Sequence, residues 1–405
     1  MPKLLQINIT ANWGSHGKIA EAIGQLVISK GWESHIAYGR WYNPSQSTLY
    51  HIGNIADEYY HGIVSRIFDN HGLMSANATK KLITYIRQVS PDIIHLHNIH
   101  GYYLNYPILF RFLREYGKPV VWTLHDCWTF TGHCAHYMFA NCEKWKTGCD
   151  HCPLLSNYPT SLLFDRSKKN FQQKKQSFLS VDNLTLVPVS KWLENELRQS
   201  FLQTKDIHLI YNGINTQRFS PAEQTKIVIE RYGIPQDRKI ILGVASNWYR
   251  KGLDDFITLS NMLPDNYHIV LVGLNKKDKK KLPNTITGIE RTENVNELVA
   301  LYSASHVLLN PTWEDNFPTI NLEAMACGTP VITYNTGGSA EAVTNETGAI
   351  IERGDIASAM SAIIEICNKD KNVYQDACRN NIISRFSDKM MLTNYMDLYQ
   401  SILHP

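Results

Sequence analysis

Short apolar runs alternate with helical lengths of sequence along most of the chain. The first run, KLLQINI, is followed by a polar turn, ANWGSHGK, and by a helical pattern from Ile19 to about Ser29. Similar runs, bounded by Pro, Gly or polar residues, recur as PDIIHLHN, KPVVWTLHD and LTLVPVS. This alternation predicts parallel β-strands joined by helices, in a sheet that is covered on both faces.

The pattern lapses around YNGINTQRFSP and then starts again. The second series contains KIILGVAS, a helix from about Leu253, HIVLVGL, HVLLNP and TPVITY. We therefore predict an α/β fold of two Rossmann-like, doubly wound parallel-sheet domains that face a cleft. The predicted domains are residues 1–212 and 213–387, and residues 388–405 form a helix that packs back across the first domain. Open parallel sheets bind ligands beyond the carboxyl ends of their strands, so functional residues are expected in the loops there.

Composition and charge exclude several classes of protein. With 43% hydrophobic and 19% charged residues, the chain can bury a core, which excludes a disordered protein. No apolar run reaches the roughly 18 residues of a membrane span, and the start MPKLLQINIT lacks a leader pattern, so a cytoplasmic protein is expected. The net charge of +3 is too small to predict binding of nucleic acid.

One segment, HVLLNPTWEDNFPTINLEAMACGTPVITYNTGG, concentrates polar chemistry at residues 306–338. A strand is expected to end near Pro311, and Pro318 suits the first position of a helix, with Asn316 or Phe317 as its cap. The amides at the start of that helix favour an anion such as a diphosphate.

Three carboxylates in the same segment are candidates for sugar recognition. Glu323 falls in the second turn of the expected helix, where it suits the hydroxyls of a ribose or hexose better than a phosphate. Glu314 or Asp315, in the loop before the helix, would accept hydrogen bonds from a sugar ring in the same way.

The spacing of these acids carries a resemblance to a known family. Asp315, seven further residues and Glu323, followed by AMACGTPVI and then GG, resemble the signature of retaining glycosyltransferases of family 4, which have the GT-B fold. That family usually has Glu at the first position, within EGFP or a similar run, whereas this chain has DNFP with Glu314 one place earlier. Only Asp315 keeps the spacing, so the resemblance implies that Asp315 and Glu323 are the catalytic carboxylates.

The resemblance continues through the segments that lead to the second domain. IYNGINTQRFSP is similar to the family's interdomain segment, with Asn215 in place of the usual aspartate. SNWYRKGLDDFI resembles the segment whose cations contact the nucleotide diphosphate. The family's basic residue before the Lys-Gly pair is replaced by Ala245 or Ser246, so Arg250 is expected to supply the charge beside Lys251. The alternative is that both cations are exposed residues at the start of a helix.

The first domain carries two further similar segments. NWGSHGK matches the family's first glycine-containing loop, where Gly14 and Gly17 let the backbone approach the acceptor or the donor phosphates. WTLHD resembles the segment with the active-site histidine, which implies that His125 faces the transferred sugar, and His97 in IIHLHN would line the acceptor side. Taken alone, a histidine at a strand end is more often structural than catalytic.

What the resemblance implies is a transferase that moves a sugar from a nucleotide-diphosphate donor with retention of configuration. The acceptor hydroxyl would give its proton to the leaving diphosphate, and no metal would be needed for catalysis. The acceptor would be a glycan or a lipid-diphosphate-linked glycan of cell-surface polysaccharide synthesis, including capsule. The residues expected to bind the donor are Gly17, Arg250, Lys251, Asn316, Phe317, Pro318, Thr319 and Glu323.

A cysteine-rich loop at residues 127–153 follows His125 directly. Clustered cysteines in a cytoplasmic protein favour metal over disulfides, and four thiolates make a closed, structural zinc site. The alternative is that reduced cysteines pack as small hydrophobic side chains. The expected ligands are Cys134, Cys142, Cys149 and Cys152, with His133, His136 or His151 as substitutes for one thiolate.

The sequence leaves other functions, and one further partner, as alternatives. A GT-B epimerase or phosphorylase would share most of these motifs. A zinc-dependent nucleic-acid or protein-binding module would use the cysteines, but that loop has few basic residues. An oxidoreductase is disfavoured because GSHGK lacks the GxGxxG spacing. The basic residues Lys168, Lys169, Lys174 and Lys175 suggest contact with an anionic membrane at the inner face of the cell, or else a solvated helix face.

Overall fold

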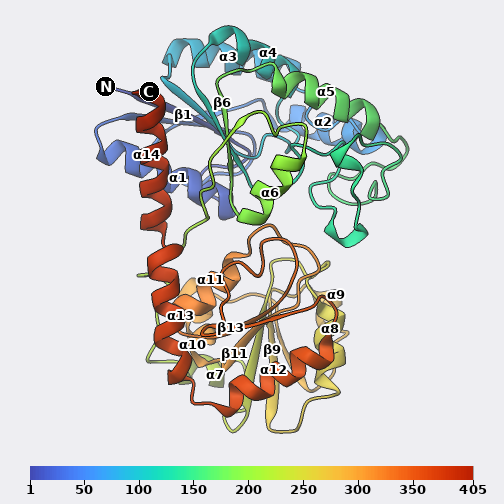
Figure 1. Ribbon diagram of the computed structural model, residues 1–405, viewed down its shortest axis with the longest axis vertical. Helices are drawn as coiled ribbons and strands as arrows, with labels where there is room; N and C mark the ends of the chain where they lie inside the picture. The colour runs from blue at the N-terminus through green and yellow to red at the C-terminus, as the bar shows by residue number, and fades with distance from the viewer. Residues whose placement is uncertain (405) are drawn as a thin grey trace. The chain divides into compact units, whose positions relative to one another are not determined.

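The computed structural model describes residues 1–404, and the chain divides into two compact units, drawn in Figure 1. Unit 1 contains Met1–Tyr211 together with the C-terminal residues from Leu392 onward, and unit 2 contains Asn212–Met391. Within the described residues, no helix is both long enough and apolar enough to cross a membrane.

Unit 1 is built on a seven-stranded parallel sheet with the order β3-β2-β1-β4-β5-β6-β7. Three of the central strands, β4, β5 and β6, are buried along their whole length, which explains their unbroken apolar sequences. The strands are β1 (Lys3–Asn8), β2 (Glu33–Tyr38), β3 (Thr48–His51), β4 (Ile93–Leu96), β5 (Val120–Leu124), β6 (Leu184–Pro188) and β7 (Asp206–Ile207).

Helices cover this sheet on both faces. In Figure 1, α3, α4 and α5 lie next to one another, and α1 packs on β1 and β2. The helices are α1 (Gly14–Ser29), α2 (Ile55–Phe68), α3 (Ala76–Val89), α4 (Tyr106–Tyr116), α5 (Ser167–Leu179) and α6 (Lys191–Gln199), with short 3₁₀ turns η1 (Met138–Ala140) and η2 (Lys144–Lys146).

Unit 2 repeats the same plan with a six-stranded parallel sheet of order β10-β9-β8-β11-β12-β13. Both sheets therefore confirm the predicted class of doubly wound α/β units. The strands are β8 (Lys239–Val244), β9 (Tyr267–Val272), β10 (Ile286–Ile289), β11 (Val307–Asn310), β12 (Val331–Tyr334) and β13 (Gly348–Ile351).

The helices of unit 2 form two groups. One group packs α7 on α10, α10 on α11 and α11 on α13, while α8 packs on α12. Their bounds are α7 (Lys226–Arg231), α8 (Leu253–Ser260), α9 (Lys276–Lys279), α10 (Val295–Ala304), α11 (Thr319–Ala326), α12 (Ile356–Asn368), α13 (Asn372–Arg385) and α14 (Asp388–Leu403).

The last helix, α14, begins in unit 2 and ends in unit 1. Within unit 1 it is anchored by two buried tyrosines. The hydroxyl of Tyr399 lies 2.6 Å from Nδ1 of His95 on β4, and that of Tyr395 lies 2.7 Å from Oγ1 of Thr123 on β5. Because these polar atoms are buried and paired, they fix the register of α14 against the sheet.

Helix α1 begins at Gly14 and not at the predicted Ile19, so the two glycines of the first loop lie in the helix. The reason is the close approach of the helix to the end of β1. A Cβ atom on Gly17 would lie 2.5 Å from Oγ1 of Thr10. Gly17 therefore serves helix packing, a role that glycine in a polar sequence does not reveal.

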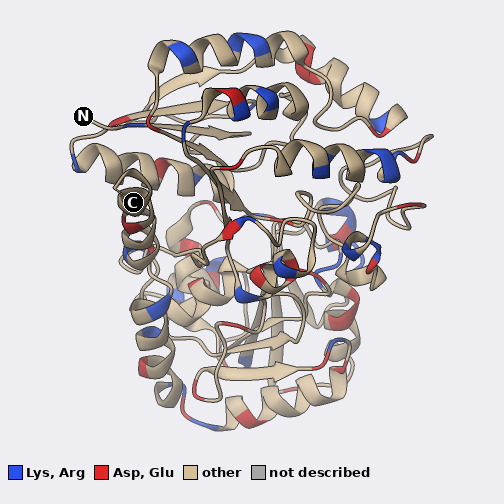
Figure 2. Ribbon diagram, turned by 45° about the horizontal axis from the view of Figure 1, so that its top comes forward, with Lys and Arg blue, Asp and Glu red and all other residues tan. Residues whose placement is uncertain are grey.

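Basic and acidic residues are mixed along the helices of both units (Figure 2). The suggestion of a basic membrane-facing surface is wrong for Lys174, which is 1% exposed and donates hydrogen bonds to the carbonyl oxygens of Trp128 and Thr131. Lys168 is exposed and lies 3.7 Å from a carboxylate oxygen of Asp150.

Candidate active site

The strand order of each unit reverses at one point, where the loops that follow two neighbouring strands diverge. In unit 1 this point lies between β1 and β4, and in unit 2 it lies between β8 and β11. Such a reversal leaves a crevice at the carboxyl edge of an open sheet, which is where ligands bind. The loops at these two points carry residues 9–13 and His97 in unit 1, and residues 245–252 and 311–318 in unit 2.

Gly252 brings the two loops of unit 2 together. Its φ is +76°, and a Cβ there would lie 2.4 Å from the carbonyl oxygen of Pro311. The close approach places the ammonium of Lys251 2.6 Å from Oδ2 of Asp315, 3.1 Å from Oγ1 of Thr312 and 2.9 Å from the carbonyl oxygen of Glu314. These three acceptors match the three N–H donors of a lysine.

Arg250 and Glu314 form a second ion pair beside the first. Nη1 of Arg250 lies 3.0 Å from both carboxylate oxygens of Glu314, and both side chains are nearly buried. Asp315 is more open, with 24% of its side chain exposed. Of the two acids that the sequence left as alternatives, Asp315 is therefore the one that solvent and ligands reach more easily.

Helix α11 follows these loops, and its start differs from the prediction by one residue. The helix begins at Thr319, and Pro318 is its cap residue, with an extended backbone (φ −72°, ψ 115°). No side chain caps the first turn, so its amides remain available as donors. Phe317, before the cap, donates its N–H to Oδ1 of Asp315 at 3.2 Å, which ties the carboxylate to the helix start.

Glu323, one turn further along α11, accepts a hydrogen bond at 2.9 Å from the hydroxyl of Tyr302 on α10. Tyr302 is fully buried, and burial next to this carboxylate raises the pKa of the phenol well above its ordinary value. The hydroxyl therefore keeps its proton and holds one oxygen of Glu323 in place. Tyr302 does not stand out in the sequence, because a tyrosine in an apolar helix has no special pattern.

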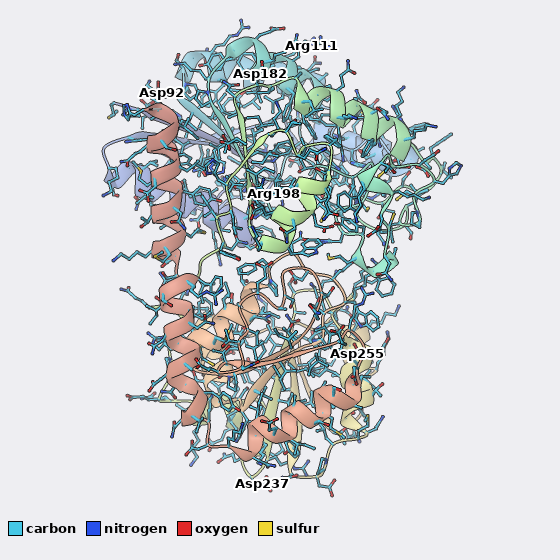
Figure 3. All side chains as sticks on the ribbon, viewed as in Figure 1. Asp92, Arg111, Asp182, Arg198, Asp237 and Asp255 are labelled. Atoms are coloured by element: carbon cyan, nitrogen blue, oxygen red, sulfur yellow. The ribbon has the colours of Figure 1, made fainter. Side chains whose placement is uncertain are left out.

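Trp313 connects the same loop to α8. Its indole N–H donates to Oδ2 of Asp255, a residue labelled in Figure 3, at 2.8 Å, and its backbone N–H donates to the carbonyl oxygen of Arg250 at 2.9 Å. The two loops of unit 2 are thus joined by backbone, by ion pairs and by an indole, so that Lys251 and Asp315 have fixed positions.

In unit 1, two histidines that follow neighbouring strands meet at the sheet edge. Gln6 uses its amide N–H to bind the carbonyl oxygen of Ala20 (2.7 Å), so its Oε1 faces Nε2 of His97 at 3.0 Å. Nε2 of His97 therefore carries the hydrogen, and the unprotonated Nδ1 lies 3.4 Å from Nε2 of His125. The structure thus brings His97 and His125 together.

A third histidine, His16 at the start of α1, lies near this pair, with its ring centre 5.8 Å from that of His125. Burial lowers the pKa of His16 to about 4 and lowers the pKa values of His97 and His125 well below the ordinary value. All three rings are neutral at pH 7, so they offer hydrogen bonds without charge. Sequence reasoning missed His16, although its place after the first strand is the signal that identified the others.

Asp126, next to His125, is held by a network of its own. It lies 2.9 Å from Nε2 of His100 and accepts the N–H of Trp128, also at 2.9 Å. Burial alone would raise the pKa of Asp126, but His100 outweighs it and holds that pKa below the usual range. The ionised carboxylate fixes the start of the cysteine-rich loop immediately after His125.

A large cavity opens at the same edge of the unit 1 sheet, beyond the ends of β2 and β3. Its volume is about 650 Å³, and sequence reasoning did not identify it. Arg40 and Glu58 form an ion pair at 3.0 Å in its wall. The aromatic and aliphatic lining residues are Tyr38, Trp41, Tyr42, Ile55, Tyr59, Ile63 and Tyr102.

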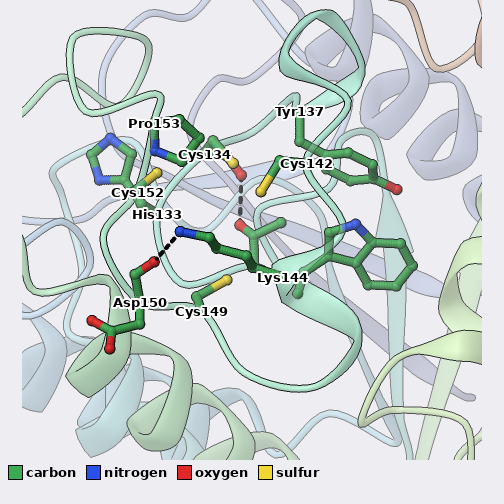
Figure 4. A pocket seen from close by; sticks show the side chains of 11 residues that line it. His133, Cys134, Tyr137, Cys142, Lys144, Cys149, Asp150, Cys152 and Pro153 are labelled. Carbon is green, nitrogen blue, oxygen red and sulfur yellow. Dashed lines mark hydrogen bonds between the residues drawn. The ribbon is translucent and has the colours of Figure 1, made fainter.

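The predicted zinc ligands lie together in the cysteine-rich loop. Cys134, Cys142, Cys149 and Cys152 line one small pocket (Figure 4), and no disulfide is present among the described cysteines. Of the histidines offered as substitutes, His133 lines the same pocket, whereas the side chain of His151 is 90% exposed.

A separate buried group joins this pocket to the rest of unit 1. Oδ1 of Asp69 lies 3.0 Å from Nε2 of His71 and 2.6 Å from Nδ1 of His133. These three side chains offer ligand atoms within 4.8 Å of one another, which is a spacing that suits a metal ion as well as a hydrogen-bond network.

Comparison with known proteins gives matches over almost the whole chain. Residues 224–384 match the family model "Glycosyl transferases group 1", and residues 20–218 match "Glycosyltransferase Family 4". The putative colanic acid biosynthesis glycosyl transferase WcaC of Escherichia coli K12 is 24% identical, over 98% of this chain and 100% of that protein.

Two further proteins extend the comparison. The UDP-Gal:alpha-D-GlcNAc-diphosphoundecaprenol alpha-1,3-galactosyltransferase of Escherichia coli is 25% identical, over 50% of this chain and 56% of that protein. The solved structure of sucrose-phosphate synthase from Thermosynechococcus elongatus superposes with a TM-score of 0.73 and 17% identity, over 100% of both chains. At that identity the superposition establishes the GT-B fold.

Proposed function

This chain is a member of glycosyltransferase family 4, and from that premise we propose that it extends a glycan carried on a lipid diphosphate during cell-surface polysaccharide synthesis. It is a retaining glycosyltransferase that uses a nucleotide-sugar donor. The proposal concerns the acceptor and the residues that perform the transfer.

The donor is assigned to unit 2. Lys251 and Arg250 bring two positive charges to the loops at the strand-order reversal, and the uncapped start of α11 adds backbone donors. Together they suit a diphosphate. Glu323, oriented by the hydroxyl of Tyr302, is the carboxylate assigned to accept hydrogen bonds from the hydroxyls of the nucleotide ribose or the sugar. Asn316 lies in the loop before Pro318, and Thr319 is the first residue of α11.

The chemical step needs negative charge to build on the leaving diphosphate while the glycosidic bond stretches. Fixed cations and amides lower that barrier because they are already oriented when the charge appears. Enzymes of this family generally work without a catalytic metal. The acceptor hydroxyl then attacks from the face that the diphosphate leaves, and its proton passes to the diphosphate.

His125 and Asp315 are assigned to the transferred sugar. His125 is neutral, so its ring hydrogen-bonds a sugar hydroxyl without repelling the positive charge that develops on the sugar ring. Asp315, held by Lys251 and by the N–H of Phe317, places a carboxylate where it accepts hydrogen bonds from another hydroxyl. His97 and Gly14 would line the acceptor side.

The observation that carries the acceptor proposal is the 650 Å³ cavity of unit 1. Its aromatic lining offers flat apolar faces to sugar rings, and Arg40 and Glu58 offer hydrogen bonds to hydroxyls. Its rim on α2 has Ile55, Tyr59 and Ile63 at 54–70% exposure, an apolar border that suits the lipid part of an acceptor. In the galactosyltransferase that is 25% identical, the named acceptor is a glycan on diphosphoundecaprenol.

The test compares two neighbouring tyrosines of α2. Tyr59 (70% exposed) lines the cavity, whereas Tyr60 (60% exposed) is not among the lining residues. We expect Tyr59→Ala to raise the KM for a lipid-linked glycan about tenfold, the effect of losing roughly 1.4 kcal/mol of aromatic contact, with the donor KM unchanged. Tyr60→Ala should behave as wild type. Equal acceptor KM values in both variants would reject this cavity as the acceptor site.

The lipid part of the proposal needs its own measurement. The same glycan is offered on a lipid diphosphate and as a free sugar, and we expect kcat/KM to be at least about tenfold higher for the lipid-linked form. Ile63→Ser should reduce that preference, while Ile227→Ser, an equally exposed position in unit 2, should not. Equal use of both acceptors by the wild type would show that the lipid is not recognised.

A further inference from the structure

The cysteine-rich segment between β5 and α5 is ordered without regular secondary structure. Residues 125–166 contain two short 3₁₀ turns, η1 and η2, and no helix or strand. Even so, Trp128, Phe130 and Trp145 in this segment are 0–1% exposed. A long irregular segment has few backbone hydrogen bonds of its own to offset the entropy of ordering it, so a cross-link is the expected device for holding it.

From the contents of its pocket we infer that this segment is held by a structural Zn²⁺ bound to Cys134, Cys142, Cys149 and Cys152. The four side chains line one pocket, as Figure 4 shows. The space open to the centre of a water-sized sphere is about 10 Å³, room for a single small occupant. A closed set of four thiolates leaves no position for a substrate, so the metal is structural.

His133 supplies a second and independent sign that the pocket has an electropositive occupant. Its side chain is fully buried, and its Nε2 has no hydrogen-bond partner. Nδ1 must carry the hydrogen, because it faces the carboxylate of Asp69 at 2.6 Å. The other oxygen of Asp69 accepts the N–H of Arg166, which fixes the carboxylate.

His71, which also hydrogen-bonds Asp69, is likewise restricted to one tautomer. The indole N–H of Trp128 donates to Nδ1 of His71 at 2.7 Å, so His71 carries its hydrogen on Nε2 and donates it to Asp69. Asp69 therefore receives two imidazole N–H groups, and the lone pair of His133 Nε2 is left at the wall of the cysteine pocket. In zinc sites a carboxylate that orients an imidazole in this way leaves the other ring nitrogen to the metal, so His133 is the ligand that would replace a thiolate if one of the four cysteines does not bind.

The charges around the pocket suit bound thiolates. The backbone N–H of Gly132 points at Sγ of Cys149, at 3.1 Å, and a side chain at Gly132 would leave no room, since its Cβ would lie 2.6 Å from Cβ of Cys149. The ammonium of Lys174 on α5 is buried beside this segment, where it donates hydrogen bonds to the carbonyl oxygens of Trp128 and of Thr131, which lines the pocket. Four thiolates on one Zn²⁺ carry a net charge of −2, which a buried cation and N–H···S contacts offset.

The first experiment measures metal in the full-length chain, produced without a histidine tag. We expect one zinc per chain after dialysis, released by a mercurial reagent that attacks thiolates. Replacement by Co²⁺ should give the charge-transfer absorption of cobalt bound to thiolates. A metal-free wild type purified from zinc-supplemented cells, or a chain with disulfides among these cysteines in a thiol count, would overturn the inference.

Matched variants then identify the ligands. Cys149→Ser and Cys152→Ser should each lower the zinc content below about one fifth per chain, while Cys367→Ser, a buried cysteine in unit 2, should keep one zinc. His133→Ala should keep the zinc but bind it about 10–100-fold more weakly, as expected for a residue beside the ligands. If His133→Ala loses the metal and Cys142→Ser keeps it, the four-cysteine assignment is wrong.

A measurement on the wild type alone tests the inference even if a variant fails to fold. Removing zinc with a chelator should lower its midpoint of thermal unfolding, and returning zinc should restore it. Zinc content is read without any sugar donor or acceptor, so this inference can fail while the proposed acceptor stands, and the reverse.

Discussion

At the scale of single residues, the candidate site is organised by pairing each charge before a ligand arrives. Lys251 has three acceptors around its ammonium, and Arg250 has the carboxylate of Glu314. In the proposed donor site, a diphosphate would replace an acceptor of Lys251 or be attracted to the ammonium through space. Either way we expect the cation to contribute most when negative charge develops on the leaving group, because its position is fixed in advance.

Lys251→Ala tests this role. We expect kcat to fall by about 10²–10³, as when one fixed donor is removed from a site of developing charge, with a smaller change in donor affinity. Stopped assays with a saturating nucleotide sugar measure it. Lys226→Ala, an exposed lysine at the amino edge of the sheet, is the control and should keep wild-type activity. Unchanged kcat in Lys251→Ala would remove Lys251 from the site.

At the scale of elements, the position of Lys251 depends on how α8 starts. Gly252 precedes α8, adopts a left-handed conformation and approaches Pro311 so closely that a Cβ does not fit. The turn between β8 and α8 is therefore pressed against the loop after β11, and the ion pair between Lys251 and Asp315 follows from that contact.

Gly252→Ala should separate the two loops. The left-handed conformation costs about 1–2 kcal/mol for alanine, and the clash adds about 1–3 kcal/mol, so we expect the free energy of unfolding to fall by about 2–5 kcal/mol. Gly233→Ala is the matched control, since Gly233 has a φ of +62° with nothing within 4 Å. It should lose only the conformational part. Urea unfolding of both variants measures the difference, and equal losses would show that the contact with Pro311 is unimportant.

At the scale of the whole molecule, unit 1 buries several neutral histidines. Burial lowers the pKa of His16 to about 4 and those of His61 and His95 to about 3. In the unfolded chain these groups titrate near the ordinary value of about 6.5. Between these values the unfolded state binds more protons than the folded one, so acid destabilises the fold.

We therefore expect the stability of unit 1 to be fully present above about pH 6.5 and to be lost as the pH falls toward 4. Each group contributes a slope of about 1.4 kcal/mol per pH unit in this window. His95→Gln removes one such group and should flatten the dependence of the unfolding midpoint on pH. His208→Gln, at an exposed position, should leave it unchanged. A midpoint independent of pH between 7 and 5 in the wild type would contradict the prediction.

Periodicity in the sequence was sufficient for the inner strands of both sheets, because buried parallel strands need continuous apolar runs, but it did not identify the edge strands β3, β7, β10 and β13. Helix α14 begins at Asp388, where the pattern places it. Helix boundaries near glycine and proline were less predictable. The starts of α1 at Gly14 and of α11 at Thr319 depend on contacts with other segments, with Thr10 and with the loop of Asp315.

By itself, the sequence determined that the chain forms two α/β units and that polar loops follow their strands, since these features depend on local pattern. It also placed His125, Lys251 and Asp315 in such loops. Only the tertiary structure decided which of these side chains meet. It buried Lys174, paired Arg250 with Glu314, and formed the aromatic cavity from segments that are separate in the chain. The physical reason is that pairing and burial depend on distances between strands and loops, which the order of residues does not contain.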